Sequence, residues 1–335
     1  MDRVTSKDVA KKAGVSQATV SRVINNYPHM KQSTREKVLK AIQELGFTPD
    51  QIARSLNMRK TSSIGLIVGD ISNPFFAETA KVIISQARKS GFDVILTDTE
   101  HESVNLEKSI ESLVGKRVEG IIIGSVDLYD SKTRQFAETG FPVVFYNTNI
   151  HEDIGNYVVL NNKKGAKVGV KHLVELGHRK IAYISGTLKY SNLSGRLEGF
   201  KEALKEYDLP FDKHLIKEFD VSSNGISTFL KAQMEQPNPP TAFFAASDQI
   251  AFTVMEAARE LGLQIPDDIS VIGFDNINIS ANPFINLTTI SQQHRRMASI
   301  ALENLLTLIK NDNEMIRNVL EPELILRSTT TTPRK

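Results

Sequence analysis

The stretch 5–26 constrains the fold of this chain more than any other part of the sequence. Two short amphipathic segments meet at Gly14, where a tight turn requires a residue that tolerates a left-handed backbone. Ser6 is placed to cap the first segment and Ser16 the second. The inner face of the second segment is apolar and consists of Val20, Val23 and Ile24. This spacing predicts two helices joined by a tight turn.

The opposite face of the second predicted helix carries hydrogen-bonding or small side chains rather than a charged, solvated surface. Its members are Gln17, Ala18, Thr19, Ser21, Arg22 and Asn25. A helix that lies in the major groove needs such a face, because base edges are recognised through hydrogen bonds and close apolar contacts. The pattern therefore favours a helix that reads DNA.

A third helix and a shorter segment follow. Ser33 and Glu36 have the spacing of a capping box, and Gly46 is placed to end the third helix. Pro49 separates this helix from the stretch 50–60, whose pattern indicates one more short helix. Because such a helix is too short to be stable alone in water, it needs a partner to form.

These motifs occur in a specific order: DVA at residues 8–10, AGVS at 13–16, TVSRVIN at 19–25, STREKV at 33–38, LGFTP at 45–49 and ARSL at 53–56. In this order they closely resemble the headpiece and hinge of the LacI/GalR family of bacterial repressors. The resemblance implies a helix-turn-helix DNA-binding domain at residues 1–47 and a hinge helix with linker at 48–60. It also implies a homodimer whose two heads bind a pseudo-palindromic operator in double-stranded DNA.

The resemblance assigns roles to single residues as well. In the family, the positions of Gln17, Ala18 and Arg22 read operator bases, and the hinge leucine, here Leu56, wedges into the minor groove. Outside that context, Gln17 is an exposed helix start and Leu56 is ordinary core. The predicted DNA contacts are Thr5, Ser16, Gln17, Ala18, Thr19, Ser21, Arg22, Asn25, Thr34, Ala53 and Leu56. Phe47 stands where many relatives carry Tyr, so no hydroxyl contact is expected there.

Charge is divided unevenly along the chain. Residues 1–60 hold twelve Lys and Arg and five Asp and Glu, a net charge of +7, whereas the whole chain has a net charge of +2. The N-terminal part is therefore the expected phosphate-binding surface. The absence of cysteine excludes disulfides and thiolate metal sites. Because no signal-peptide pattern or membrane-spanning apolar run occurs, we expect a cytoplasmic protein, and no motif indicates a cofactor.

Beyond residue 60, continuous apolar runs alternate with amphipathic helices, which is typical of parallel strands covered by helices on both faces. Predicted strands are 64–69, 92–97, 120–124, 143–146, 157–160, 180–185, 214–218, 242–245, 270–273, 286–290 and 324–327. Predicted helices are 75–89, 105–114, 132–138, 165–176, 195–207, 226–236, 250–261 and 295–309. The tail from Ser328 is polar, and we expect it to fray.

The expected fold is an all-α helix-turn-helix headpiece with a hinge helix, followed by an α/β two-lobed, periplasmic-binding-protein-like (type I) effector domain at residues 61–330. The strand 157–160 is expected to open the second βα series. By the family resemblance, the first lobe comprises about 61–150 and 293–320, and the second about 155–290 and 321–330. The chain is then expected to cross between lobes near 147–153, 275–279 and 291–293. Without a C-terminal heptad helix, we expect a dimer rather than a tetramer.

Open parallel sheets bind ligands beyond the carboxyl ends of their strands. Carboxylates and amides at these ends suit sugar hydroxyls, and aromatic rings cover the apolar face of a sugar. The predicted effector contacts are Asn73, Phe75, Phe76, Asn147, Asn192, Arg196, Asp220, Asp248 and Asp275. Ser125 and Tyr190 also follow strand ends, and Asp70 and Asp98 are weaker candidates. In the family, the positions of Arg196, Asp248 and the aromatic residue after the first strand commonly contact the effector.

Several of these candidates have a plainer structural explanation. Asp248 fits a helix cap, Arg196 a salt bridge with Glu198, and Asp275 a role in holding a crossing loop. Phe75 and Phe76 cannot both face a cleft from one helix, so one of them is expected in the core.

The sequence therefore predicts a DNA-binding transcriptional regulator, most simply a repressor, controlled by a small effector such as a sugar, sugar phosphate or nucleoside. A sugar-binding protein of a transport system is the competing interpretation, and an enzyme on the same fold is a third. The headpiece argues against a transport protein. No phosphate-binding glycine loop, nucleophile triad or metal-ligand cluster supports an enzyme. A phosphorylated effector needs more cationic groups than Arg196 alone, which favours a neutral sugar or nucleoside.

Overall fold

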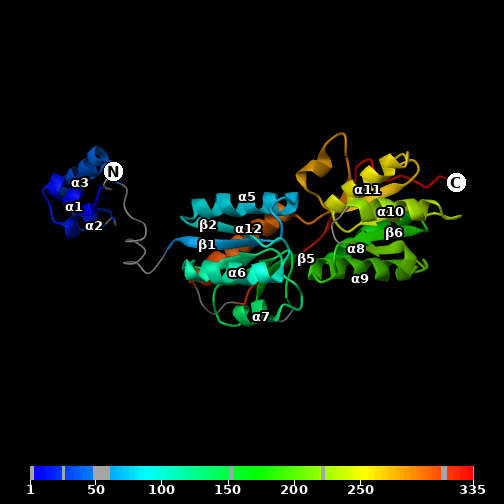
Figure 1. The fold of residues 1–335 in the computed structure, drawn as a ribbon, viewed down its shortest axis with the longest axis horizontal. Coiled ribbons are helices and arrows are strands. Elements are labelled where there is room, and N and C mark those ends of the chain that lie inside the picture. The colour runs from blue at the N-terminus through cyan, green and yellow to red at the C-terminus, as the bar shows by residue number, and fades with distance from the viewer. Residues whose placement is uncertain are drawn as a thin grey trace. The chain divides into compact units, whose positions relative to one another are not determined.

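The computed structural model describes residues 4–24, 27–47, 61–150, 154–219, 223–310 and 315–334. The chain divides into two compact units, Met1–Thr61 and Ser62–Lys335, whose elements are labelled in Figure 1. The predicted hinge helix, with Ala53 and Leu56, lies outside the described residues, and so do Asn25 and Asp220.

The first unit contains α1 (Ser6–Ala13), α2 (Gln17–Ile24) and α3 (Gln32–Leu45). Each helix contributes a fully buried valine to the centre, namely Val9, Val20 and Val38. Gly14 and Gly46 have φ angles of 67° and 61°, which confirms the two predicted left-handed positions. Three small amphipathic helices therefore share one core.

Two predicted helix caps are wrong. Thr5, not Ser6, caps α1, because the Thr5 backbone N–H donates to the Asp8 carboxylate at 2.9 Å and the Asp8 N–H donates back to the Thr5 hydroxyl. The helix α3 begins after Lys31 without a side-chain cap. Both helices therefore start earlier than predicted. In α1 the reciprocal hydrogen bonds of Thr5 and Asp8 provide the cap, and in α3 no side chain caps the first turn. The cap on α2 is confirmed: Thr19 N–H donates to Ser16 Oγ at 3.2 Å.

The second unit contains two six-stranded sheets, and the first has the order β11-β5-β4-β3-β1-β2. Its strands, paired in parallel throughout, are β1 (Ser63–Val68), β2 (Asp93–Asp98), β3 (Ile121–Ile123), β4 (Val143–Tyr146), β5 (Asn156–Leu160) and β11 (Arg317–Leu320). The helices of this lobe are α5 (Pro74–Lys89), α6 (Ser103–Gly115), α7 (Ser131–Ala137) and α12 (His294–Lys310). Figure 1 shows α5 and α6 on opposite sides of β1.

Strand β1 explains how both faces of this sheet are filled. Leu66 and Val68 pack into the cluster that includes α5 and α12, whereas Ile67 packs with α6. Gly65 points toward α6 as well, and a Cβ there would lie 2.7 Å from Leu113. A larger residue would push α6 away from the sheet, so the close approach requires glycine.

The second sheet has the order β12-β10-β9-β8-β6-β7. Its strands are β6 (Ile181–Ser185), β7 (Ile216–Glu218), β8 (Ala242–Ala245), β9 (Ser270–Asp275), β10 (Thr288–Ser291) and the antiparallel edge strand β12 (Glu323–Ile325). Its helices are α8 (Asn162–Glu175), α9 (Ser191–Glu206), α10 (Ser223–Met234) and α11 (Asp248–Glu260), with short 3-10 helices η1 (Lys213–Leu215) and η2 (Asn278–Ala281). The predicted pair of doubly wound lobes is confirmed.

The path of the chain between the lobes differs from the prediction. Strand β5 pairs with β4, so it belongs to the first sheet and does not open the second series. The chain therefore first crosses after Leu160, not near 147–153, and it stays in the second lobe through 275–279. The crossing near 291–293 is confirmed, because β10 lies in the second sheet and α12 packs on α5. The last crossing lies between β11 and β12.

The C-terminal tail is held in place, so the expected fraying is wrong. Thr329 is 3% exposed, and its hydroxyl donates to Val271 O at 2.6 Å while it accepts from Thr288 N–H at 2.9 Å. Thr331 O lies 2.8 Å from His178 Nε2. Because a carbonyl only accepts, Nε2 carries the proton, and His178 Nδ1 is left to accept from the Thr241 hydroxyl at 2.8 Å.

Replacing His178 by glutamine should reduce the decrease in the free energy of unfolding that occurs as the pH falls below neutral. Burial lowers the pKa of His178, so the folded state favours the neutral ring. The unfolded chain takes up this proton near pH 6.5. The free energy of unfolding therefore falls as the pH drops below that value, by at most about 1.4 kcal/mol per pH unit for one proton. Urea unfolding from about pH 7 to about pH 5 measures the slope.

The exposed His29→Gln change in the headpiece is the matched control and should keep the wild-type slope. An unchanged slope in the His178→Gln protein would show that the tail contact does not depend on the neutral ring.

Candidate functional site

The outer face of α2 is exposed, as a helix that reads DNA requires. Gln17, Ala18, Ser21 and Arg22 are exposed, whereas Val20 and Val23 are buried. Gln17 Nε2 donates to Ser6 Oγ at 2.8 Å, which holds this amide against α1. The described part of the predicted base-reading set therefore lies on one surface, opposite the core.

The other predicted headpiece contacts gather at helix N-termini. Thr5 caps α1, and Ser16 lies before α2 with its Oγ 2.9 Å from Thr19 Oγ1. Thr34 is half-buried in the first turn of α3. Backbone N–H groups at helix starts attract phosphate, so this arrangement suits contacts that position the head without reading bases.

Arg196 on α9 is the centre of the predicted effector site. It is 1% exposed, its Nε donates to Asn162 Oδ1 at 2.9 Å, and its Nη1 lies 3.4 Å from Asp275 Oδ1. Its guanidinium carbon is 3.8 Å from the centre of the Phe274 ring. The Nη2 atom is buried and has no hydrogen-bond partner among the described residues. The alternative pairing with Glu198 does not occur, because Glu198 pairs with Lys163 at 2.7 Å.

Asp248 is bonded by the protein rather than open to a ligand. Its Oδ2 accepts from Ile277 N–H at 3.0 Å and from the Ser280 hydroxyl, and its Oδ1 accepts from Thr289 Oγ1. Burial and the nearby Asp275 charge raise its pKa. The helix-cap explanation is wrong, since Ser247 caps α11. Asp248 instead ties the loop after β9 to β10.

Asp275 joins the predicted ligand arginine to the crossing segment. Its Oδ1 accepts from Arg196 and from Gln292 Nε2, and its backbone carbonyl accepts from Gln292 N–H at 3.3 Å. Burial raises the pKa of Asp275, and the Arg196 guanidinium opposes that rise. Asp275 therefore holds Gln292 in the crossing segment near 291–293, whereas the predicted crossing at 275–279 does not occur. Gln292 was not predicted, and its Oε1 is buried without a partner in the described parts of the chain.

The two lobes touch through polar groups. Asn192 Nδ2 on α9 donates to Asn147 Oδ1 after β4 at 3.2 Å, so two predicted residues from different lobes meet. Tyr190 OH and Ser125 Oγ each lie 3.2 Å from His101 Nδ1. The cavity beside them measures about 10 Å³, room for about one water molecule. His101 was missed, although it follows a predicted strand as the other candidates do.

The remaining candidates lie at the start of α5 and around it. Asn73 caps α5 by accepting from Phe75 N–H at 3.0 Å. Phe75 and Phe76 are both buried, with ring centres 5.4 Å apart, and face different neighbours: Phe76 lies 6.1 Å from the His101 ring and Phe75 6.3 Å from the His294 ring. Asp98 accepts from Ile71 N–H at 2.8 Å, which indicates a role in the turn rather than at a ligand.

Other site types find no support in the described ranges. No group of three or more His, Asp and Glu residues there is placed to hold a metal ion. No described helix has both the length and the apolar character to cross a membrane.

Comparison with known proteins agrees with this two-part architecture. Residues 5–50 match the family model described as bacterial regulatory proteins, lacI family, and residues 170–330 match that of a periplasmic binding protein-like domain. The ribose operon repressor of Haemophilus influenzae is 35% identical over 324 residues, which are 96% of this chain and 97% of the relative. The chain belongs to the LacI family.

Other members of the LacI family support the same assignment. The HTH-type transcriptional repressor PurR of Aliivibrio salmonicida is 34% identical, with 96% of this chain and 98% of the relative covered. The crystal structure of the Lac repressor dimer bound to operator and the anti-inducer ONPF matches with a TM-score of 0.89 and 30% identity, covering 98% of this chain and all of that one. This LacI-family chain is thus a DNA-binding regulator with an effector-binding domain, and its named relatives are repressors rather than enzymes.

Proposed function

We propose that this protein represses transcription as a homodimer on operator DNA, and that a neutral, polyhydroxylated small molecule bound between the lobes changes its affinity for DNA. The observation that carries the effector part is the buried Nη2 of Arg196, which lacks a hydrogen-bond partner among the described residues. A buried donor without an acceptor costs about 1–3 kcal/mol, and more when it is charged. A ligand oxygen at this position removes that cost.

A hydroxyl group suits the site better than a simple acceptor. Arg196 and Gln292 both donate to the same Asp275 oxygen, so the two side chains meet at this carboxylate. Of these, Arg196 Nη2 is a donor and Gln292 Oε1 is an acceptor, and both are buried without partners in the described chain. Because a hydroxyl donates and accepts at once, a sugar or the ribose of a nucleoside satisfies both.

Charge at the site argues against a phosphorylated effector. The buried carboxylates of Asp248 and Asp275 lie around Arg196, and both lower the potential that an anion would meet. A neutral ligand avoids this repulsion while it uses the same hydrogen bonds.

Entry of such a ligand requires the lobes to separate. His101 contacts Tyr190 beside a space of about 10 Å³, and Asn192 donates to Asn147 of the other lobe, so polar contacts hold the lobes together. Effector binding therefore exchanges contacts between lobes for contacts with ligand. This supplies the difference between two states that allostery needs, with a coupling of about 1–3 kcal/mol in typical systems.

Replacing Arg22 by alanine tests the DNA part of the proposal. Arg22 is exposed on α2, and an arginine bonded to a guanine edge gives about 1–3 kcal/mol of discrimination. We expect the affinity for an operator selected from a random duplex pool to fall about 10- to 100-fold, with a much smaller loss on random duplex. Fluorescence anisotropy at two salt concentrations measures both affinities.

The Lys11→Ala change removes one headpiece charge from α1 and should lower the affinity for both duplexes equally. Equal losses on the two duplexes with the Arg22 variant would exclude base reading by this residue.

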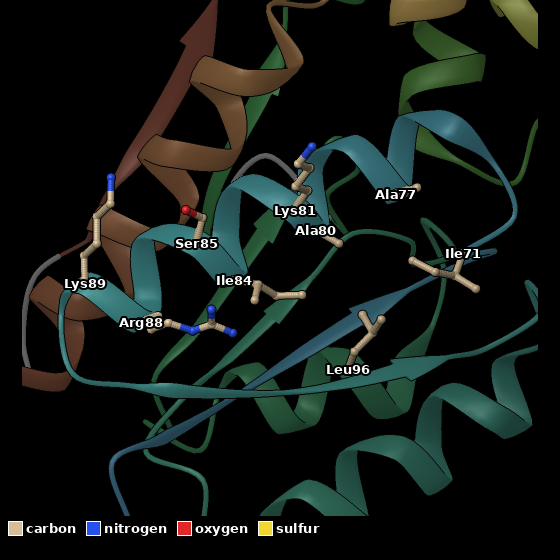
Figure 2. Close-up of a pocket in the computed structure, with 9 residues that line it drawn as sticks. All are labelled: Ile71, Ala77, Ala80, Lys81, Ile84, Ser85, Arg88, Lys89 and Leu96. Carbon is tan, nitrogen blue, oxygen red and sulfur yellow. The ribbon is translucent and has the colours of Figure 1, made fainter.

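A groove on the first lobe supports the dimer. A cavity of about 580 Å³ lies between α5 and the edge strand β2, and Figure 2 shows Ile84 and Leu96 facing each other across it while Lys81 and Lys89 extend away. Leu96 is 37% exposed and Ile71 38% exposed on this face. Since the similar Lac repressor structure is a dimer, we assign the groove to a second copy of this chain.

Replacing Leu96 by aspartate should dissociate the dimer, because an unpaired carboxylate would have to be buried between the copies. We expect the dimer dissociation constant to rise about 100-fold or more, measured by sedimentation equilibrium. Val114→Asp on α6 is the matched control, since Val114 is 39% exposed but lies away from the groove. If the Leu96→Asp protein had the same dimer dissociation constant as the wild type, the dimer interface would not include this groove.

A further inference from the structure

The segment that leads from the second lobe into α12 carries a second pocket, outside the predicted effector site. It measures about 390 Å³, within the range of small-molecule sites, and is lined by Asn276, Asn278, Gln293, Arg295, Arg296 and Arg327, among others. Asp275 and Gln292 bond to one another near Arg196, whereas the residues that follow them, Asn276 and Gln293, line this pocket. Neither Arg196 nor Asp248 lines it, so the two sites are separate.

The arginines of this pocket bond only to neutral oxygens. Arg295 donates to Asn278 Oδ1 at 2.9 Å, Arg296 to Gln293 Oε1 at 3.0 Å, and Arg327 to Asn276 Oδ1 at 2.7 Å. In the part of the chain that the structure describes, none of these arginines forms an ion pair with a carboxylate. Each guanidinium has five N–H donors, so donors remain for a ligand.

Two carboxylates lie beside the pocket, and both are already bonded to the protein. Glu78 accepts from Asn278 N–H at 2.9 Å and lies 2.8 Å from His294 Nε2. Asp248 is bonded to Ser280 and Thr289. The helix α12 also begins at the pocket and is 17 residues long, so its N-terminal dipole adds to the positive potential.

We propose that this pocket binds a small phosphate-bearing metabolite or inorganic phosphate as a second ligand. Concave sites that collect several guanidinium groups without counter-charge favour anions, and phosphate oxygens match the forked donors of arginine. The pocket is built from the loop after β9, the crossing segment and the residue that follows β12 by two positions. A phosphate there bridges the crossing segment and two loops of the second lobe, and so biases how the crossing segment is held. The inference does not depend on a neutral effector in the cleft.

Titration calorimetry of the full chain with inorganic phosphate, pyrophosphate and glucose 6-phosphate, at constant ionic strength, tests this assignment. We expect binding of one anion per chain, and the tightest of the three probes identifies the source of the phosphate. The double variant Arg295→Gln/Arg296→Gln should bind at least about tenfold more weakly, because charge-assisted hydrogen bonds are lost. The Arg295→Lys/Arg296→Lys protein keeps the charge but not the forked donors, so its affinity should lie between those of the wild type and the glutamine double variant.

The matched control is Arg134→Gln/Arg259→Gln, which removes the same charge from surface helices away from the pocket. It should bind like the wild type. Equal weakening in both glutamine doubles would show a general charge effect and overturn the proposal. Undiminished binding by the Arg295→Gln/Arg296→Gln protein would also overturn the proposal, because it would place the anion on the basic headpiece. Absence of binding by the wild-type protein would overturn it as well.

Discussion

Replacing Arg196 by alanine should lower the free energy of unfolding of the second unit by about 3–5 kcal/mol and remove its response to effector. Arg196 is fully buried and compensates Asp275, which in turn lies near Asp248. Without the guanidinium, a carboxylate remains buried without a counter-charge. Because burial already raises the pKa of Asp275, protonation relieves part of the penalty, and the loss of stability should shrink as the pH falls.

Urea unfolding at neutral and mildly acidic pH measures the first effect, and a thermal-shift screen with sugars and nucleosides measures the second. The control is Arg134→Ala, whose exposed pair with Glu138 is expected to contribute at most about 1 kcal/mol. If the Arg196 variant kept the wild-type stability, the buried pair would not support the second lobe. If it kept the wild-type ligand shift, Arg196 would not belong to the effector site.

Removing residues 1–61 should abolish DNA binding and leave the second unit folded. The chain divides at this point into two compact units, and Ser62–Lys335 has cores of its own in both lobes. Residues 1–60 carry a net charge of +7, so the truncated chain is acidic and loses the phosphate-binding surface. Anisotropy with generic duplex at low and moderate salt should show no binding, whereas circular dichroism should show the α/β signal.

A point variant separates loss of the headpiece from loss of its fold. Val20 is completely buried in the headpiece core, so Val20→Asp should unfold that unit alone and abolish DNA binding in the full-length chain. Salt-dependent binding by the truncated protein would place the DNA-contact surface in the second unit and refute the proposed role of α2.

Local patterns predicted most helices and strands, because the spacing of apolar residues along the sequence matches the period of each helix or strand. The strand Val143–Tyr146 was predicted to the residue, since its four apolar side chains are all buried. Strand β11 was missed, because only Leu320 of its four residues is buried and no continuous apolar run marks it. The assignment of β5 to the wrong sheet has another cause: its sequence indicates a strand but not whether β4 or β6 will be its neighbour.

The predicted sites divide in the same way. Exposure of Gln17 and Arg22 follows from helical periodicity around Val20, so the surface of α2 was available from the sequence. The polar tail was expected to fray, because nothing near Thr329 in sequence announces its bonds to Val271 and Thr288.

The sequence by itself determined the three-helix head, the alternation of strands and helices and the residues available at the strand ends. Only the tertiary structure decided that Arg196 pairs with Asp275, 79 positions away, and that Arg327 joins Arg295 and Arg296 around one pocket. The physical reason is that periodicity and capping act within a few residues, whereas the charge and burial of a site depend on segments that meet only after both sheets have formed.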